Sequence, residues 1–90
     1  MEQLKGKRYD RSVSPTKVLS QNLRELREAR GLTQETTAER AGLAVRHYQQ
    51  IEAAERPGLQ LATVGRLAKA FRLEPWQLLQ PGIAGESEKS

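Results

Sequence analysis

Apolar residues recur at helical spacing along most of this chain. Leu19, Leu23 and Leu26 follow one another at intervals of four and three residues, which places their side chains on one face of an α-helix. Val64, Leu67 and Phe71 follow further along at intervals of three and four residues, which is also helical spacing. No segment alternates apolar and polar residues with the period of two that is typical of a strand. The pattern predicts an all-α domain with these leucines, Val64 and Phe71 in its core.

Capping and helix-breaking residues divide this pattern into five short helices. Ser14 followed by Pro15 is a typical helix start, because the hydroxyl can cap the helix and proline at the first helical position needs no N–H. Gly31 fits the left-handed residue that ends such a helix. The remaining helices are expected from Thr33 to Gly42, from Ala44 to Ala53, from Leu61 to Phe71, and from Glu74-Pro75 through Trp76, Leu78 and Leu79. Five helices with short connections predict a compact bundle.

The two ends of the chain differ from this helical part. Residues 1–13 lack helical periodicity and hold four basic residues against two acidic ones, which predicts a disordered basic arm. Residues 82–90 are rich in glycine, serine and charge, which predicts a frayed tail. The folded domain is therefore expected over residues 14–81.

The composition of the chain excludes several classes of functional site. The 90 residues carry a net charge of +4 and no cysteine, so a disulfide scaffold, a thiolate metal site and a cysteine nucleophile are excluded. The apolar runs are far shorter than the ~20 residues of a membrane span, and no secretory signal is visible. We find no nucleophile–base pair, metal-ligand cluster or phosphate-binding glycine loop. We therefore expect a cytoplasmic binding protein with no catalytic activity, metal, cofactor or small-molecule substrate, whose partner is acidic or another protein.

The second and third helices carry the most informative spacing. Gly42 lies between them, and small residues, Ala38 and Ala41, come just before it. A glycine allows a tight left-handed turn, and small side chains allow two helices to cross closely. Both features are what a helix-turn-helix needs.

The sequence of this region resembles that of the phage-repressor (Cro-like, Xre-type) helix-turn-helix family, whose fold is the lambda-repressor-like DNA-binding domain. The resemblance covers about Lys17 to Gln80. Its most specific features are Arg-Gly-Leu-Thr-Gln at 30–34, Ala38 with Gly42, Ile51-Glu52, and Leu-Ala-Lys-Ala at 67–70.

The resemblance implies where DNA would be contacted. Residues 33–41 match the motif helix that crosses the DNA backbone, with Thr33 and Gln34 at its N-terminus. The helix dipole and free N–H groups there suit a phosphate. Residues 44–53 match the recognition helix, whose base-facing residues would be Val45, Arg46 and Gln50, with His47 and Gln49 beside them. In the major groove, arginine can bond guanine, glutamine can bond adenine, and valine can contact a thymine methyl group.

Arg27 and Glu52 match a family ion pair that joins the first helix to the recognition helix, and arginine suits it because its guanidinium can bond a carboxylate bidentately. Three residues depart from the family pattern: Thr37 replaces a leucine, Ala44 replaces a hydroxyl cap, and Ala54 replaces a glycine.

Three further side chains have alternative interpretations. Tyr48 has the spacing of a core residue, with DNA contact as the alternative. His47 is the only histidine and lacks companions for metal binding, so it is expected to face solvent or a phosphate. Trp76 is expected in the core, with a self-association surface as the alternative.

The leading functional hypothesis is a sequence-specific, double-stranded-DNA-binding transcriptional regulator, specifically a repressor. One such domain reads few base pairs, so a homodimer on two half-sites is expected. The resemblance suggests a dimer contact around Trp76, Leu79 and Gly82. The alternative is a protein-interaction module of antitoxin or adaptor type that uses the same fold.

Overall fold

The computed structural model describes residues 14–56 and 58–87. The basic arm predicted for residues 1–13 lies outside the described residues. Within the described ranges there is no strand, and the chain forms α1 (Pro15–Ala29), α2 (Gln34–Ala41), α3 (Val45–Glu52), α4 (Leu61–Ala70), the 3-10 helix η2 (Pro75–Leu79) and α5 (Ile83–Ser87). The predicted all-α fold is confirmed.

α1 begins and ends as the sequence predicts. The Ser14 hydroxyl accepts a hydrogen bond from the Lys17 backbone N–H at 3.2 Å, and Pro15 occupies the first turn. The helix ends at Ala29, and Gly31 then adopts a φ of +66°. Leu19, Leu23 and Leu26 are all buried, so the spacing of four and three residues marks the core-facing side of α1.

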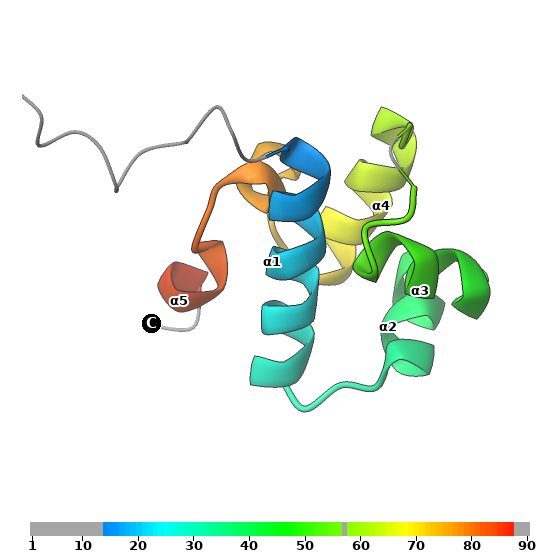
Figure 1. Ribbon diagram of the computed structural model, residues 1–90. Coiled ribbons are helices and arrows are strands. Elements are labelled where there is room, and N and C mark those ends of the chain that lie inside the picture. Colours follow the sequence, from blue (N-terminus) through cyan, green and yellow to red (C-terminus); the bar gives the residue numbers. More distant parts are fainter. Residues whose placement is uncertain (1–13, 57, 88–90) are drawn as a thin grey trace, which may run out of the picture.

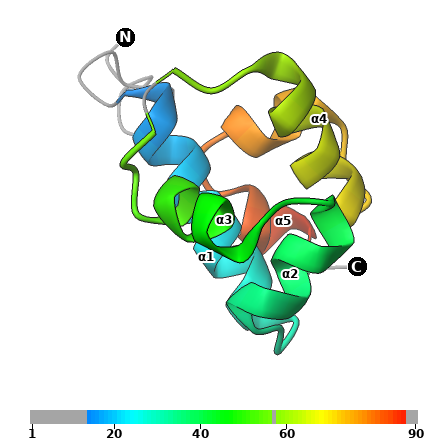
Figure 2. The ribbon, with the colours of Figure 1, turned by 90° about the vertical axis from the view of Figure 1, so that its right-hand side faces the viewer.

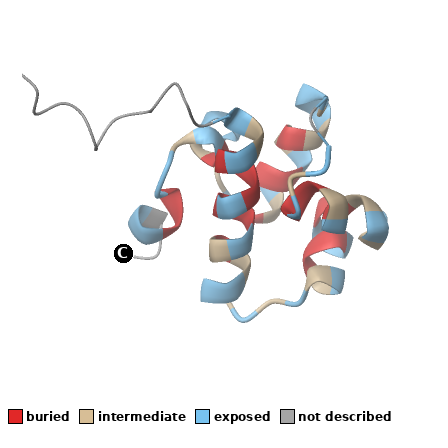
Figure 3. Ribbon diagram, viewed as in Figure 1, coloured by how far each residue is buried: buried red, intermediate tan, exposed pale blue. Residues whose placement is uncertain are grey.

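α1 is the central element of the bundle. Figure 1 shows α2 and α3 on one side of α1 and α5 on the other. Figure 2, seen from the side of α2 and α3, has α5 behind them. α4 and η2 pack against each other, and both complete the core. Buried residues gather where the helices face one another (Figure 3). This packing leaves one side of α3 turned away from the bundle.

The turn between α2 and α3 depends on Gly42, which has a φ of +71°. The Leu43 N–H bonds to the Ala38 carbonyl at 2.9 Å, and the Gly42 N–H bonds to the Glu39 carbonyl at 3.0 Å. This is the Schellman arrangement, which satisfies the last carbonyls of a helix and favours glycine in the left-handed position. Ala38 and Ala41 are buried just before the turn. The two helices therefore meet closely, as their small residues predict.

The prediction of a frayed C-terminal tail was wrong for residues 83–87. They form α5, in which the side chains of Ile83 and Ala84 are buried against α1. Asn22 of α1 also donates hydrogen bonds to the Leu78 and Gln80 carbonyls, at 2.7 and 2.9 Å. These two bonds hold the end of η2, from which α5 follows, and burial of Ile83 and Ala84 stabilises α5 although Gly85 disfavours a helix.

The core position predicted for Trp76 was also wrong, because 64% of this residue is exposed. The fifth helix is 3-10 rather than α, so residues three apart lie above one another. Leu78 points into the core, which leaves Trp76 and Leu79 together on the outer side. A 3.6-residue period does not predict this arrangement.

Candidate nucleic-acid interface

α3 has one buried side and one exposed side. Tyr48, Ile51 and Glu52 are buried, and the core position predicted for Tyr48 is confirmed. Arg46 and Gln49 are exposed and Gln50 is partly exposed. The spacing of these three residues places them on one side of the helix, which we call the outer face of α3. It presents a guanidinium and two amides, all able to form hydrogen bonds.

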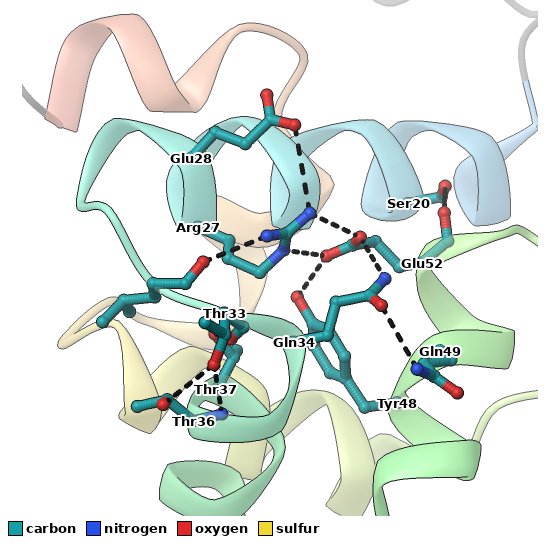
Figure 4. Close-up of polar contacts among 11 residues, drawn as sticks. Ser20, Arg27, Glu28, Thr33, Gln34, Thr36, Thr37, Tyr48, Gln49 and Glu52 are labelled. Atoms are coloured by element: carbon teal, nitrogen blue, oxygen red, sulfur yellow. Dashed lines mark hydrogen bonds and ion pairs between the residues drawn. The ribbon is translucent and has the colours of Figure 1, made fainter.

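Behind this face, the Glu52 carboxylate accepts four hydrogen bonds (Figure 4). Arg27 of α1 donates through Nε at 2.8 Å and through Nη2 at 3.1 Å. Tyr48 donates its hydroxyl at 2.6 Å, and Gln34 of α2 donates Nε2 at 2.8 Å. We call these four residues the Glu52 network. It includes the ion pair expected between Arg27 and Glu52, and it joins α1, α2 and α3 behind the outer face.

The network determines the charge of its members. Burial alone would raise the pKa of Glu52, but the hydrogen bonds from Arg27, Tyr48 and Gln34 outweigh it and hold that pKa below its ordinary value. The hydrogen bond to Glu52 raises the pKa of Arg27. Burial, followed by the bond to Glu52, raises the pKa of Tyr48. At neutral pH, Glu52 is therefore an ionised acceptor, Arg27 is a cation and Tyr48 is a neutral donor.

Sequence reasoning did not find the contributions of Tyr48 and Gln34 to this network. For Tyr48 a signal was present, because Tyr48 and Glu52 are four residues apart and such pairs are neighbours on a helix. For Gln34 no signal was present, since its contact with Glu52 depends on how α2 and α3 cross.

The N-terminus of α2 lies next to the outer face of α3. The Thr33 hydroxyl caps α2 by accepting the Thr36 N–H at 3.0 Å. Gln34 follows, and its Oε1 accepts a hydrogen bond from Gln49 Nε2 at 3.3 Å. Figure 4 shows Gln34 reaching toward Glu52 and Gln49. The structure thus brings Thr33 and Gln34 into one region with the exposed side of α3.

Two residues assigned to DNA contact lie differently from the outer face. Val45 is half-buried and packs against the core. His47 is also half-buried, and its Nε2 is buried with no hydrogen-bond partner in the described part of the chain. Neither side chain is as exposed as Arg46 or Gln49.

The three departures from the family pattern, Thr37, Ala44 and Ala54, each affect the structure locally. Thr37 is buried, and its hydroxyl donates to the Thr33 carbonyl at 2.9 Å. Ala44 gives α3 no side-chain cap. Ala54 has a φ of +61°, in the left-handed region that disfavours residues with a Cβ. Ala54 therefore adopts, at a steric cost, the left-handed backbone conformation that a glycine would adopt without strain.

Within residues 14–56 and 58–87, no group of histidine, cysteine, aspartate and glutamate side chains is arranged to hold a metal ion. None of the described helices has the length and apolar character needed to cross a membrane.

Comparison with known proteins gives one finding. A family model described as a helix-turn-helix domain matches residues 18–78, from the first turns of α1 into η2. No curated protein and no solved structure matches the chain.

Proposed function

The chain belongs to the helix-turn-helix domain family, and on that basis we propose that it is a sequence-specific regulator that binds double-stranded DNA through α3. The observation that carries this proposal is the outer face of α3, where Arg46, Gln49 and Gln50 lie together with no exposed carboxylate from that helix. Its single acidic residue, Glu52, is buried and paired with Arg27. A helix of this size fits the major groove, where these side chains can bond base edges.

The N-terminus of α2 supports a phosphate contact beside that groove. The Thr33 hydroxyl accepts the Thr36 N–H, and other backbone N–H groups of the first turn of α2 stay directed outward. Gln34 donates one of its two amide hydrogens to Glu52. The second hydrogen can reach a phosphate oxygen, which the helix dipole also favours. The Cro-like, Xre-type assignment and the role as a repressor form part of this proposal.

The same proposal includes a homodimer, because one short helix reads too few base pairs for useful specificity. An exposed apolar surface supports it. Leu61 is 84% exposed, Trp76 64% and Leu79 38%, and Leu61 and Leu79 line an open groove of about 160 Å³ between α1 and α4. Pairing two copies through this apolar surface would cover the side chains and give two copies of α3 to two half-sites.

Binding to labelled duplex DNA, measured as a function of salt, tests the proposal. Affinity should fall steeply as salt rises, because phosphate neutralisation releases counterions. Arg46→Ala should weaken binding to the preferred site by about 1–3 kcal/mol and relax base preference. Arg24→Ala removes the same charge from the exposed side of α1 and should keep the preference. A flat salt response, or equal losses in both variants, would contradict groove binding.

The exposed apolar surface also favours a second candidate function, a protein-interaction module of antitoxin or adaptor type. Contiguous exposed apolar side chains often mark binding sites for another protein. Replacing both Arg46 and Gln50 with alanine separates the two functions. The DNA-binding account expects the loss of base preference, whereas binding of a protein through Trp76 should be unaffected.

In either function the role is binding rather than catalysis and needs no cofactor. A regulator of this kind acts where the DNA is, so we place it in the cytoplasm, associated with the chromosome.

A further inference from the structure

We infer that the two neighbouring glutamines of α3 recognise opposite base chemistry, because their partners within the chain orient the two amides in opposite senses. Gln49 presents its oxygen as an acceptor, and Gln50 presents its nitrogen as a donor. The inference rests on the proposed DNA binding and adds to it the class of base that each residue selects.

The orientation starts at Glu52. An ionised carboxylate only accepts hydrogen bonds, and the pKa of Glu52 is lowered by the bonds from Arg27, Tyr48 and Gln34, which outweigh its burial. Gln34 lies 2.8 Å from Glu52 Oε1, so the atom facing Glu52 has to be the Gln34 nitrogen. Rotating the amide by half a turn would place its oxygen against a carboxylate oxygen. The Gln34 oxygen is thereby directed away from Glu52.

That oxygen orients Gln49. Gln34 Oε1 accepts a hydrogen bond from Gln49 Nε2 at 3.3 Å, and an oxygen facing it would find no donor. The Gln49 nitrogen therefore faces α2, and the Gln49 oxygen is left for an external donor. Because Gln49 is exposed, that acceptor is open to a ligand. Glu52 and Gln34 thus act as positioning residues for Gln49.

Gln50 is oriented in the opposite sense. Arg56, in the segment after α3, donates Nη1 to Gln50 Oε1 at 3.0 Å. A guanidinium only donates hydrogen bonds, so the atom facing Arg56 has to be the Gln50 oxygen. The Gln50 nitrogen and its hydrogens are left for an external acceptor. Arg56 is the positioning residue here.

The major groove offers a distinct partner for each orientation. Adenine and cytosine carry amino groups, at N6 and N4, which donate hydrogen bonds. Guanine and thymine carry keto oxygens, O6 and O4, which accept them. Gln49 should therefore select adenine or cytosine at the position it faces, and Gln50 should select guanine or thymine. A glutamine with no such partners can present either end.

Selection from a random duplex pool tests the inference with a matched pair of variants. Gln49→Ala and Gln50→Ala first identify the base pair that each residue faces. Gln49→Glu and Gln50→Glu then add the same charge and the same acceptor at adjacent positions. We expect Gln49→Glu to keep the preference for an amino base, since an acceptor already points outward there. The unaltered chain should prefer a keto base about fivefold at the position that Gln50 faces. Gln50→Glu should abolish or reverse that preference, because a carboxylate only accepts hydrogen bonds.

Two further variants test the positioning residues. Gln34→Ala should relax the preference only at the base pair facing Gln49, and Arg56→Ala only at the one facing Gln50. Gln21→Ala is the control, because Gln21 is also an exposed glutamine whose Nε2 donates to a neighbour, Glu25 Oε2, at 2.9 Å. It should change neither preference. Gln34→Ala also removes the proposed phosphate contact, so an even loss of affinity across all sequences is expected beside the relaxed preference. An even loss with unchanged preference at both base pairs, in either variant, would show that the residue does not orient its glutamine.

The possible results separate this inference from the proposed function. If the unaltered chain selects a sequence but both glutamate variants shift it in the same way, or neither shifts it, the inference is wrong and DNA binding stands. If the unaltered chain selects no duplex sequence, the proposed function and this inference both fail.

Discussion

The outer face of α3 and the apolar surface around η2, formed by Leu61, Trp76 and Leu79, both face solvent. They differ in whether their side chains are held by hydrogen bonds within the chain. Gln49 and Gln50 on α3 each have a hydrogen-bond partner within the chain. Through Gln34, the first of them connects to a buried ion pair. Leu61 and Trp76 are largely exposed and Leu79 is partly exposed, and the two leucines line an open groove.

The difference is instructive because oriented polar groups and exposed apolar groups contribute to recognition in different ways. A hydrogen-bond donor or acceptor discriminates only when its direction is fixed. Apolar surface gains free energy from leaving water whatever its direction. The face of α3 therefore suits a ligand that has to be distinguished from close relatives, and the surface around η2 suits an association that stabilises an assembly.

The largest effect is expected where the network supports α3. Arg27→Ala should destabilise the fold by about 3–5 kcal/mol, because it leaves the buried Glu52 carboxylate without its cation. Arg24→Ala removes an exposed arginine of the same helix and should change stability by no more than about 0.5 kcal/mol. Urea unfolding of the two variants measures the difference. Equal midpoints would mean that the Glu52 network does not support the fold.

Acidification should weaken the same network. The pKa of Glu52 in the folded protein lies below its ordinary value of 4.5. Its contribution to stability is therefore present above that value and is lost as the pH falls through the lower, folded-state pKa. Urea unfolding between pH 7 and pH 3 should show a steeper loss for the unaltered chain than for Glu52→Gln.

Glu39→Gln, on the exposed side of α2, is the control for that experiment and should keep the pH dependence of the unaltered chain. An unchanged slope in Glu52→Gln would assign the acid sensitivity to other carboxyl groups.

A smaller and opposite effect is expected just after α3. Ala54→Gly should stabilise the fold by about 1 kcal/mol, because glycine adopts a positive φ without the steric cost of a Cβ. Ala53→Gly, one residue earlier with a φ of −88°, should destabilise it by about 0.5–1 kcal/mol. Thermal unfolding of both variants checks the pair. Stabilisation by both, or by neither, would show that Ala54 carries no strain.

The smallest effect on folding is expected at the apolar surface. Trp76→Ser should change the unfolding free energy of the monomer by no more than about 0.5 kcal/mol, since most of this side chain is already exposed. Self-association, measured by sedimentation, should weaken. A large loss of monomer stability would show that Trp76 supports the core, and unchanged self-association would show that copies pair through another surface.

The sequence predicts the elements that follow local rules. Ser14 and Pro15 start α1, Gly42 makes the turn, and the leucines of α1 are buried, because caps, left-handed glycines and helical spacing act within a few residues. α5 could not be predicted, since Ile83 and Ala84 are buried against α1, an element that lies about sixty residues earlier in the chain.

The same distinction applies to the candidate site. The exposure of Arg46 and Gln49 follows from helical period, and the Arg27–Glu52 pair follows from the resemblance. The contact of Gln34 with both Glu52 and Gln49 depends on how α2 crosses α3. The orientation of Gln50 depends on the path of the chain after α3. No pattern within one helix carries that information.

Methylation interference on a selected duplex tests most directly whether α3 reads bases in the major groove. Methylation of guanine N7 modifies that groove, whereas methylation of adenine N3 modifies the minor groove. We expect N7 methylation within each half-site to prevent binding of the unaltered chain, and to have little effect on the residual binding of Arg46→Ala. Interference confined to adenine N3, or the same N7 pattern for both proteins, would contradict the account.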